Sequence, residues 1–291
     1  MDLNIHPPGG PVRAAASVVM LRDAPGGLEV FLIKRHGLSD VLGGAYVFPG
    51  GKLDSNDAQP DTVALLDQSP AQLHARLGEP ELDPLAAAGL YVAALREAFE
   101  ETGILYAAGA EAALAAEATA LLREGRAFDA VITMLALRLN ASELTPWSRW
   151  ITPRVSAVSK KRFDTRFFIA RAPTGQEATH DNHEATASVW LSPRAALRLY
   201  WDRGIDLAPP QIMGLAHLAR HDSVASVMAQ ARSRLPPLIQ PEPFEHDGMR
   251  VLCYPGDERH PVSERALPGP TRLEYRDQRF QPVGGFDALF A

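Results

Sequence analysis

Residues 96–104 read Arg96-Glu97-Ala98-Phe99-Glu100-Glu101-Thr102-Gly103-Ile104. Residues three and four apart share one face of a helix, so Glu97, Glu100 and Glu101 crowd together. Gly103 is typical of the residue that ends a helix, which puts the cluster at the pole that already carries partial negative charge. Both effects cost free energy, and a bound divalent cation would offset both. All-oxygen ligands favour magnesium or manganese over zinc.

A solvated helix face is the alternative explanation of this cluster, because runs of glutamate on helices are usually exposed. The opposite side of the same helix carries an apolar arc made of Val92, Leu95, Ala98, Phe99 and Thr102. Such an arc indicates a docked helix whose polar face is fixed in space. Arg96 lies one turn before Glu100 and offsets only part of the charge.

The composition narrows the class of protein. The chain has 291 residues, a net charge of −6 and no basic run, which argues against a nucleic-acid partner. Cys253 is the single cysteine, so an internal disulfide is excluded and a reducing, cytoplasmic setting is expected. The first residues lack the features of a signal peptide. No apolar run approaches the roughly 20 residues of a membrane span, so we expect no membrane partner.

The order of predicted elements favours an α/β (α+β) fold, a mixed β-sheet with helices on both sides. We expect a flexible arm at 1–12, a main domain at 13–234 and a C-terminal extension at 235–291 that packs on it. Residues 54–84 are polar and look like an insertion. The predicted strands are 15–21, 28–34, 46–48, 147–152, 162–170 and 187–191, with weak ones at 249–254 and 273–275. The predicted helices are 70–77, 84–102, 109–124, 127–139, 193–202, 209–220 and 222–233.

The glutamate helix and the preceding glycine pair together resemble the box of the Nudix hydrolases, G-x5-E-x7-R-E-U-x-E-E-x-G-U, where U is aliphatic. Gly51 matches the first glycine. The second half is matched position by position by Arg96, Glu97, Glu100, Glu101, Gly103 and Ile104. The resemblance implies a Nudix-type α/β/α sandwich with an insertion and extra C-terminal helices.

Two departures from the box leave one question open. Between Gly51 and Ile104 the chain is 31 residues longer than the box. The glutamate of the first half is missing: counting forward from Gly51 reaches Asp57, and counting back from Arg96 reaches Ala88. Either Asp57 is a shorter substitute ahead of the insertion, or the position is Ala88 and the carboxylate is lost.

The resemblance implies a role for each matched residue. Glu97, Glu100 and Glu101 would bind Mg²⁺ or Mn²⁺, together with the backbone carbonyl of Gly51. Arg96 would orient the carboxylates, and we count it with Glu100 and Glu101 as the catalytic set. Members of the family hydrolyse a diphosphate with water, and one glutamate acts as base. Which glutamate does so stays open.

A late loop offers one more carboxylate. Family members often use an acid ahead of a late strand, and Glu184 is our candidate for a further metal ligand. A solvated loop glutamate is the alternative. His180, Asp181 and His183 in the same loop could bind a metal, but a surface loop is the favoured interpretation.

The long insertion and several further segments resemble a coenzyme A diphosphatase-like branch of the family. If this holds, the partner is a small-molecule nucleoside diphosphate derivative, coenzyme A or acyl-CoA. NADH or ADP-ribose is the alternative substrate, and a catalytically silent nucleotide-binding module is the alternative class. A homodimer is expected from the family only.

Four residues are candidates for binding the substrate. Gly50 belongs to the glycine pair, and Arg35 ends a strand near it. Arg162 and Arg166 share one face of the predicted strand at 162–170, and two guanidinium groups so placed can meet neighbouring phosphate oxygens. Ion pairing of these arginines with Asp164 or with the insertion is the equal alternative.

Overall fold

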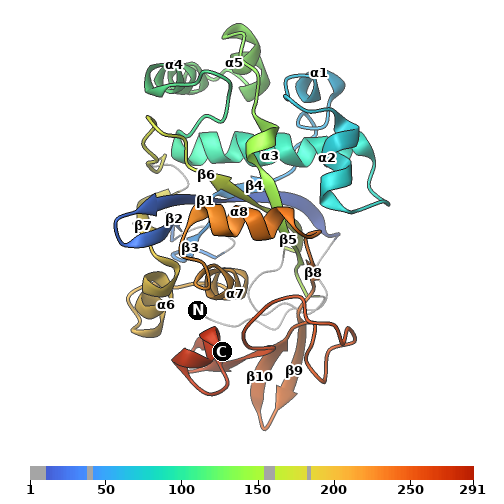
Figure 1. Ribbon diagram of the computed structural model, residues 1–291, viewed down its shortest axis with the longest axis vertical. Helices are drawn as coiled ribbons and strands as arrows, with labels where there is room; N and C mark the ends of the chain where they lie inside the picture. Colours follow the sequence, from blue (N-terminus) through green and yellow to red (C-terminus); the bar gives the residue numbers. More distant parts are fainter. Residues whose placement is uncertain (1–10, 38–41, 154–160, 182–184) are drawn as a thin grey trace.

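A mixed β-sheet between two helical layers forms the body of the molecule (Figure 1). This computed structural model describes residues 11–37, 42–153, 161–181 and 185–291. The glutamate helix α3 (Pro84–Thr102) lies along one face of the sheet, and α6 (Pro193–Trp201), α7 (Pro209–Leu218) and α8 (Val224–Arg232) lie on the other. The expected α/β architecture is confirmed.

The sheet is built around one hairpin. β1 (Arg13–Ala24) and β2 (Gly27–Arg35) are antiparallel, as predicted. β6 (Phe163–Arg171) runs parallel to β1 on its other side. In the described residues the strand order is β3-β2-β1-β6-β5-β8, with β4 on β1 and β7 on β2. The other strands are β3 (Tyr46–Val47), β4 (Gly50–Lys52), β5 (Thr145–Ile151), β7 (Ala185–Leu191) and β8 (Leu238–Ile239).

Alternation along the central strands divides the core into two clusters. Val18 and Phe168 face α3, whereas Val19 and Phe167 face the layer of α7 and α8. Successive side chains of a strand point to opposite faces, so a strand that is covered on both faces is apolar throughout. The run of buried residues from Ala15 to Leu21 follows from this.

Local signals set the two ends of α3. The Asp83 side chain accepts hydrogen bonds from the backbone N–H groups of Leu85 (2.9 Å) and Ala86 (3.2 Å), and Pro84 takes the first helical position. Gly103 ends the helix in the left-handed conformation, with φ 73°. Caps of this kind depend on the local residue types and can be predicted from the sequence. The predicted helix 84–102 is confirmed at both ends.

The insertion is folded and packs against α3. Its helix α2 (Pro70–Leu77) begins with a capping box between Ser69 and Gln72, as the sequence predicts a helix there. A second helix, α1 (Pro60–Val63), was missed because four residues show no apolar periodicity. Two further helices, α4 (Ala112–Arg123) and α5 (Phe128–Met134), cover the outer side of α3, and a 3-10 turn spans Ala141–Glu143.

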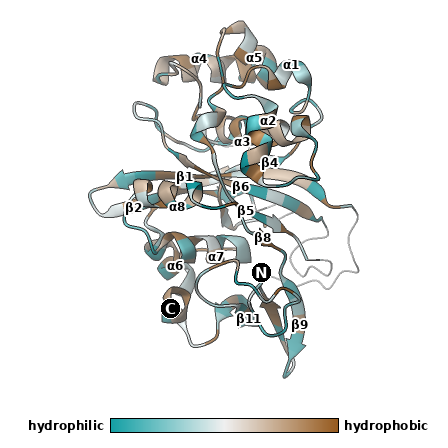
Figure 2. Ribbon diagram, turned by 45° about the vertical axis from the view of Figure 1, so that its right-hand side comes forward, coloured by the Kyte–Doolittle hydropathy of each residue, from teal (hydrophilic) through white to brown (hydrophobic). Residues whose placement is uncertain are grey.

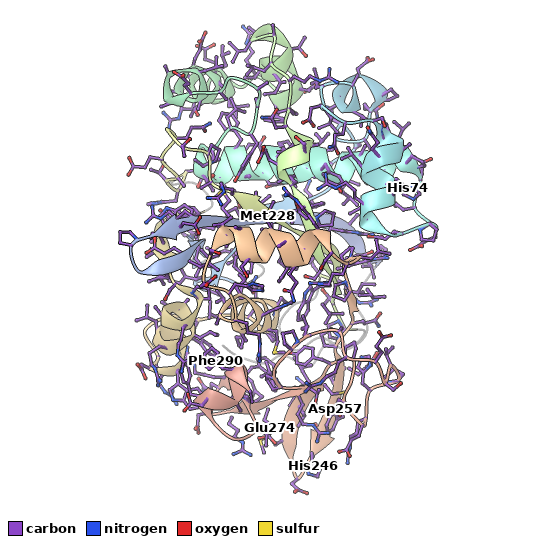
Figure 3. The ribbon with its side chains drawn as sticks, in the orientation of Figure 1. His74, Met228, His246, Asp257, Glu274 and Phe290 are labelled. Carbon is purple, nitrogen blue, oxygen red and sulfur yellow. The ribbon has the colours of Figure 1, made fainter. Side chains whose placement is uncertain are left out.

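The C-terminal tail forms more β-structure than expected. An antiparallel sheet contains β9 (Glu242–His246), β10 (Met249–Cys253), β11 (Arg272–Arg276) and β12 (Arg279–Pro282). Leu252, Leu273 and Phe280 of this sheet join the core cluster of α7 and α8. Asp257, labelled in Figure 3, accepts two hydrogen bonds from Arg272, which ties the long loop to the sheet. The chain closes with a 3-10 turn at Phe286–Phe290.

Hydrophobic and hydrophilic residues are interspersed along the helices and strands (Figure 2). Within the part of the chain that the structure describes, we find no helix with the length and apolar character needed to cross a bilayer.

Candidate active site

The glycine pair is fixed to the central strand β1. The Ser17 hydroxyl and the Val18 N–H both donate to the Pro49 carbonyl at 2.8 Å. The register then sets Gly50 opposite Ser17 and Gly51 opposite Ala16. At Gly50 a Cβ atom would lie 2.4 Å from the Ala16 carbonyl oxygen, and φ is 153°. Only glycine fits this close approach.

The two glycines lie against the glutamates of α3. The Gly50 N–H donates to Glu101 Oε2 at 2.7 Å. A Cβ atom on Gly51 would lie 2.3 Å from Glu97 Oε1, so the Gly51 backbone touches the Glu97 carboxylate. Glu101 is 3% exposed, while the Glu100 side chain is 37% exposed. The structure thus brings the predicted ligands Gly51, Glu97 and Glu101 together, with Glu100 at the solvent side.

Arg96 connects the cluster to the glycine loop. Its Nη1 donates to Glu97 Oε1 (2.9 Å) and to Glu100 Oε2 (3.0 Å), and its Nη2 donates to the Lys52 carbonyl (3.2 Å). Burial alone would lower the pKa of Arg96, but its hydrogen bonds to Asp57 and the charge of Glu97 raise it, so the guanidinium stays charged. Burial also raises the pKa of Glu100, and Arg96 offsets part of that shift.

Asp57 takes the place of the missing first-half glutamate. Its Oδ1 accepts from Arg96 Nε and its Oδ2 from Arg96 Nη2, both at 2.9 Å. Ala88, the other possible position, is fully buried in the apolar core. The neighbouring residue Ala58 is pressed onto α3, because a Cβ on Gly89 would lie 2.8 Å from the Ala58 Cβ. Of the two positions, Asp57 brings a carboxylate to Arg96 and Ala88 brings none.

The residues fit a hard divalent cation in their chemistry. Carboxylates and a backbone carbonyl are the oxygen ligands that such ions prefer, and the absent Gly51 side chain lets the Glu97 carboxylate lie against the glycine backbone. In the described residues, however, no three histidine, cysteine or acidic side chains converge as metal ligands. The contacts explain this arrangement: Arg96 lies between Glu97 and Glu100, and Gly50 holds Glu101.

Arg166 does not have the place predicted for a substrate-binding residue. It is 4% exposed, and its guanidinium donates to both carboxylate oxygens of Glu79, with 3.0 Å from Nε to Oε1. Arg149 joins the same network through Glu79 (2.9 Å) and Asp164 (2.8 Å). Glu79 follows α2 and belongs to the insertion. Arg166 therefore forms ion pairs with the insertion and with Asp164, which was the alternative to substrate binding.

The structure gives Arg162 other partners, leaves one donor of Arg35 unpaired, and does not describe Glu184. The Arg162 guanidinium donates to the carbonyls of Thr152 (3.1 Å) and Pro153 (3.2 Å). Arg35 ends β2, and its Nε is buried without a hydrogen-bond partner among the described residues. Glu184 lies outside the described residues, as does His183.

The described part of the late loop supports the surface-loop interpretation. His180 Nδ1 lies 3.1 Å from Ser188 Oγ, and Asp181 Oδ1 accepts from the Ala185 N–H at 3.2 Å. These contacts fold the loop onto β7.

Lys52 and Asp54 belong to the site and were not predicted. Lys52 Nζ lies 2.5 Å from Asp54 Oδ1, and Asp54 Oδ2 lies 3.7 Å from Arg96 Nη2. The hydrogen bond from Lys52 holds the pKa of Asp54 below its usual value. Their position directly after Gly51 was the signal that could have identified them.

Comparison with known proteins gives a family and a fold. The family model described as "NUDT19 Nudix domain" matches residues 83–218. The chain is 28% identical to the acyl-coenzyme A diphosphatase NUDT19 of Xenopus laevis, over 80% of this chain and 71% of the relative. It is 26% identical to the human protein of the same name, over 89% of this chain and 83% of the relative.

A solved structure agrees with these sequence matches. The crystal structure of a NUDIX hydrolase from Alicyclobacillus acidocaldarius superposes with a TM-score of 0.63 and 28% identity. The match covers 78% of this chain and 97% of that protein.

Proposed function

Since the chain belongs to the Nudix hydrolases, we propose that it is a metal-dependent diphosphatase that acts on coenzyme A or acyl-CoA. The observation that carries the proposal is the contact of the Gly50-Gly51 backbone with Glu101 and Glu97 on α3, beside Arg96. A cation bound there would neutralise the diphosphate and acidify a water molecule.

The protein groups divide the remaining tasks. In the proposed reaction, water attacks one phosphorus, the bridging P–O bond breaks, and the electron pair leaves with the departing phosphate. We assign Glu100 as the acceptor of the proton, because it is the most exposed of the three carboxylates while Glu101 is held by Gly50. Arg96 keeps Glu97 and Glu100 in position through its charge and hydrogen bonds.

Arg35 is the arginine we propose for a substrate phosphate. A buried donor without an acceptor is rare in proteins, and the Arg35 Nε is such a donor among the described residues. A phosphate oxygen would satisfy it. Gly50 stays a proposed substrate-binding residue because its N–H faces Glu101, and Arg162 stays one although it already donates to two carbonyls.

The choice of substrate rests on the two relatives described above, both of which are named acyl-coenzyme A diphosphatases. NADH and ADP-ribose are the alternative substrates within the same reaction. A silent nucleotide-binding module is disfavoured because Glu97, Glu100 and Glu101 are all present on one helix face.

A substrate panel tests the proposal. The purified protein is incubated with coenzyme A, acetyl-CoA, NADH, ADP-ribose and diadenosine compounds, with Mg²⁺, Mn²⁺ or EDTA, and the products are identified by mass. We expect cleavage of the coenzyme A compounds to a phosphopantetheine and adenosine 3′,5′-bisphosphate, and none with EDTA. If none of the diphosphates is cleaved with either metal, the proposed diphosphatase activity is refuted.

Two matched variants separate chemistry from folding. Glu100→Gln keeps the shape of the side chain and removes its charge, so we expect metal-dependent cleavage to be lost while the thermal unfolding temperature stays. Glu117→Gln makes the same change on the exposed face of α4 and should keep full activity. Equal activity of the two variants would refute the role of Glu100.

A further inference from the structure

Three basic residues lie near the start of β1 and of β6 and at the end of β4: Arg13, Lys161 and Lys52. The chain contains only four lysines, and two of them lie here. Arg13 and Lys161 are exposed, and the Lys52 side chain is 59% exposed. We call this group the basic patch.

The sheet register brings the basic patch together. Ala15 pairs directly with Lys52, so the two side chains share a face, and Arg13, two residues before Ala15, shares it too. Arg13 pairs with Phe163 of β6, and its N–H donates to the Arg162 carbonyl at 3.0 Å. Strand dimensions put the Cα atom of Lys52 about 8 Å from that of Arg13, and Lys161 directly precedes Arg162, whose carbonyl accepts from Arg13. Long side chains at this spacing can reach one anionic group.

A short chain of contacts joins the basic patch to the glutamates. Lys52 pairs with Asp54, Asp54 lies 3.7 Å from Arg96, and Arg96 donates to Glu100. Neighbouring residues of a strand face opposite sides, so Gly51 contacts Glu97 while Lys52 faces away from it. A ligand whose diphosphate lies at the glutamates can therefore reach the basic patch around the end of β4.

We propose that the basic patch binds a phosphomonoester that the substrate carries apart from its diphosphate. This inference rests on the proposed function and narrows its substrate class. A phosphomonoester has a charge of about −1.5 to −2 at neutral pH, whereas the Lys52–Asp54 pair is an exposed ion pair of little strength. The phosphate displaces Asp54 from Lys52. Coenzyme A has such a group on its ribose; NADH and ADP-ribose do not.

Binding of two nucleotides tests the basic patch without any catalysis. Adenosine 3′,5′-bisphosphate and AMP differ by one phosphomonoester, and their dissociation constants are measured by calorimetry. For the unaltered protein we expect the bisphosphate to bind about tenfold more tightly, as one or two charge-assisted hydrogen bonds provide. Arg13→Gln, Lys52→Gln and Lys161→Gln should each reduce that ratio, and added salt should reduce it as well.

Arg22→Gln is the matched control, because Arg22 is a half-exposed arginine of the same strand about 30 Å from Arg13. It should keep the tenfold ratio. Equal binding of the two nucleotides by the unaltered protein overturns the inference. A ratio that the three patch variants leave unchanged overturns it too.

Kinetics keep this inference separate from the proposed function. The ratio of kcat/KM for coenzyme A to that for dephospho-coenzyme A should fall in Arg13→Gln and Lys161→Gln and stay in Arg22→Gln. If both compounds are cleaved equally well by the unaltered protein, the basic patch has no role and the diphosphatase stands. If neither is cleaved, the diphosphatase is refuted, and the nucleotide binding ratio still decides the basic patch.

Discussion

The Asp57 carboxylate holds the Arg96 guanidinium through two hydrogen bonds of 2.9 Å, across 39 residues of sequence. The contact spans the insertion, because a carboxylate near its start reaches the arginine of the helix that follows it. The third guanidinium nitrogen of Arg96, Nη1, donates hydrogen bonds to Glu97 and Glu100. The insertion lengthens the motif without removing its internal ion pair.

Asp57→Ala should therefore damage both stability and activity. Removal of Asp57 takes two charge-assisted hydrogen bonds from the largely buried Arg96, which keeps its pairs with Glu97 and Glu100, and this costs about 2 kcal/mol of unfolding free energy. We expect kcat to fall at least about tenfold, since a misplaced ligand raises the barrier by 1.4 kcal/mol or more. Urea unfolding and steady-state kinetics measure the two effects.

Two further variants show whether the Asp57 carboxylate is the cause. Asp57→Glu restores a carboxylate and should recover part of kcat. Asp61→Ala, on the exposed side of α1, should change stability by no more than about 0.5 kcal/mol. A kcat in Asp57→Ala equal to that of the unaltered protein would show that Arg96 needs no such support.

Gly51→Ala should reduce activity far more than stability. The new methyl group would lie 2.3 Å from Glu97 Oε1, and this flexible side chain can move aside at little cost in unfolding free energy. The displaced Glu97 would no longer reach a cation beside Gly51. We expect a rise in the Mg²⁺ concentration that gives half-maximal rate.

Gly26→Ala is the control for this substitution, because a Cβ there meets nothing within 4 Å. It should leave the magnesium dependence as it is. Identical magnesium curves for Gly51→Ala and Gly26→Ala would count against a metal at Gly51.

Glu79→Gln should destabilise the fold. Glu79 is buried between Arg166 and Arg149, and the neutral amide leaves their charges partly unpaired, at about 3 kcal/mol. The KM for the substrate should stay, because this network binds the insertion to β5 and β6 and not a ligand. Thermal unfolding and steady-state kinetics check the two statements, with exposed Glu81→Gln as the comparison. A large rise in KM at unchanged stability would show that Arg166 contributes to substrate binding.

His217 should make the protein less stable in mild acid. Burial lowers its pKa to about 3, and the charge of Arg234 adds to the shift. In the unfolded chain the histidine pKa is near 6.5, so His217 binds a proton there at a pH at which it stays neutral in the native state. The free energy of unfolding therefore falls as the pH drops below about 6.5. Between pH 7.5 and 5.5 the loss is about 1.4 kcal/mol.

Replacement of His217 by Asn should remove this contribution, which is read as the difference in urea unfolding between the two pH values. His246→Asn, at an exposed position of β9, should keep the pH dependence of the unaltered protein. A slope that survives in His217→Asn would assign the effect to other groups.

The sequence was sufficient wherever the determining signal is local. Asp83, Pro84 and Gly103 set both ends of α3, and Ser69 with Gln72 set the start of α2. Apolar runs bounded by turn residues gave the hairpin of β1 and β2. Short elements without such signals escaped prediction: α1 has four residues, and β9 and β12 lie in a Pro-rich tail.

By itself, the sequence determined which side chains form the glutamate face of α3, because residues at 97, 100 and 101 are neighbours in any helix. Tertiary structure alone decided which groups meet that face. Asp57 rather than Ala88 reaches Arg96, since the start of the insertion is pressed against Gly89. Glu79 removes Arg166 from the substrate site. Both contacts join residues far apart in the chain, and no spacing along a single element encodes them.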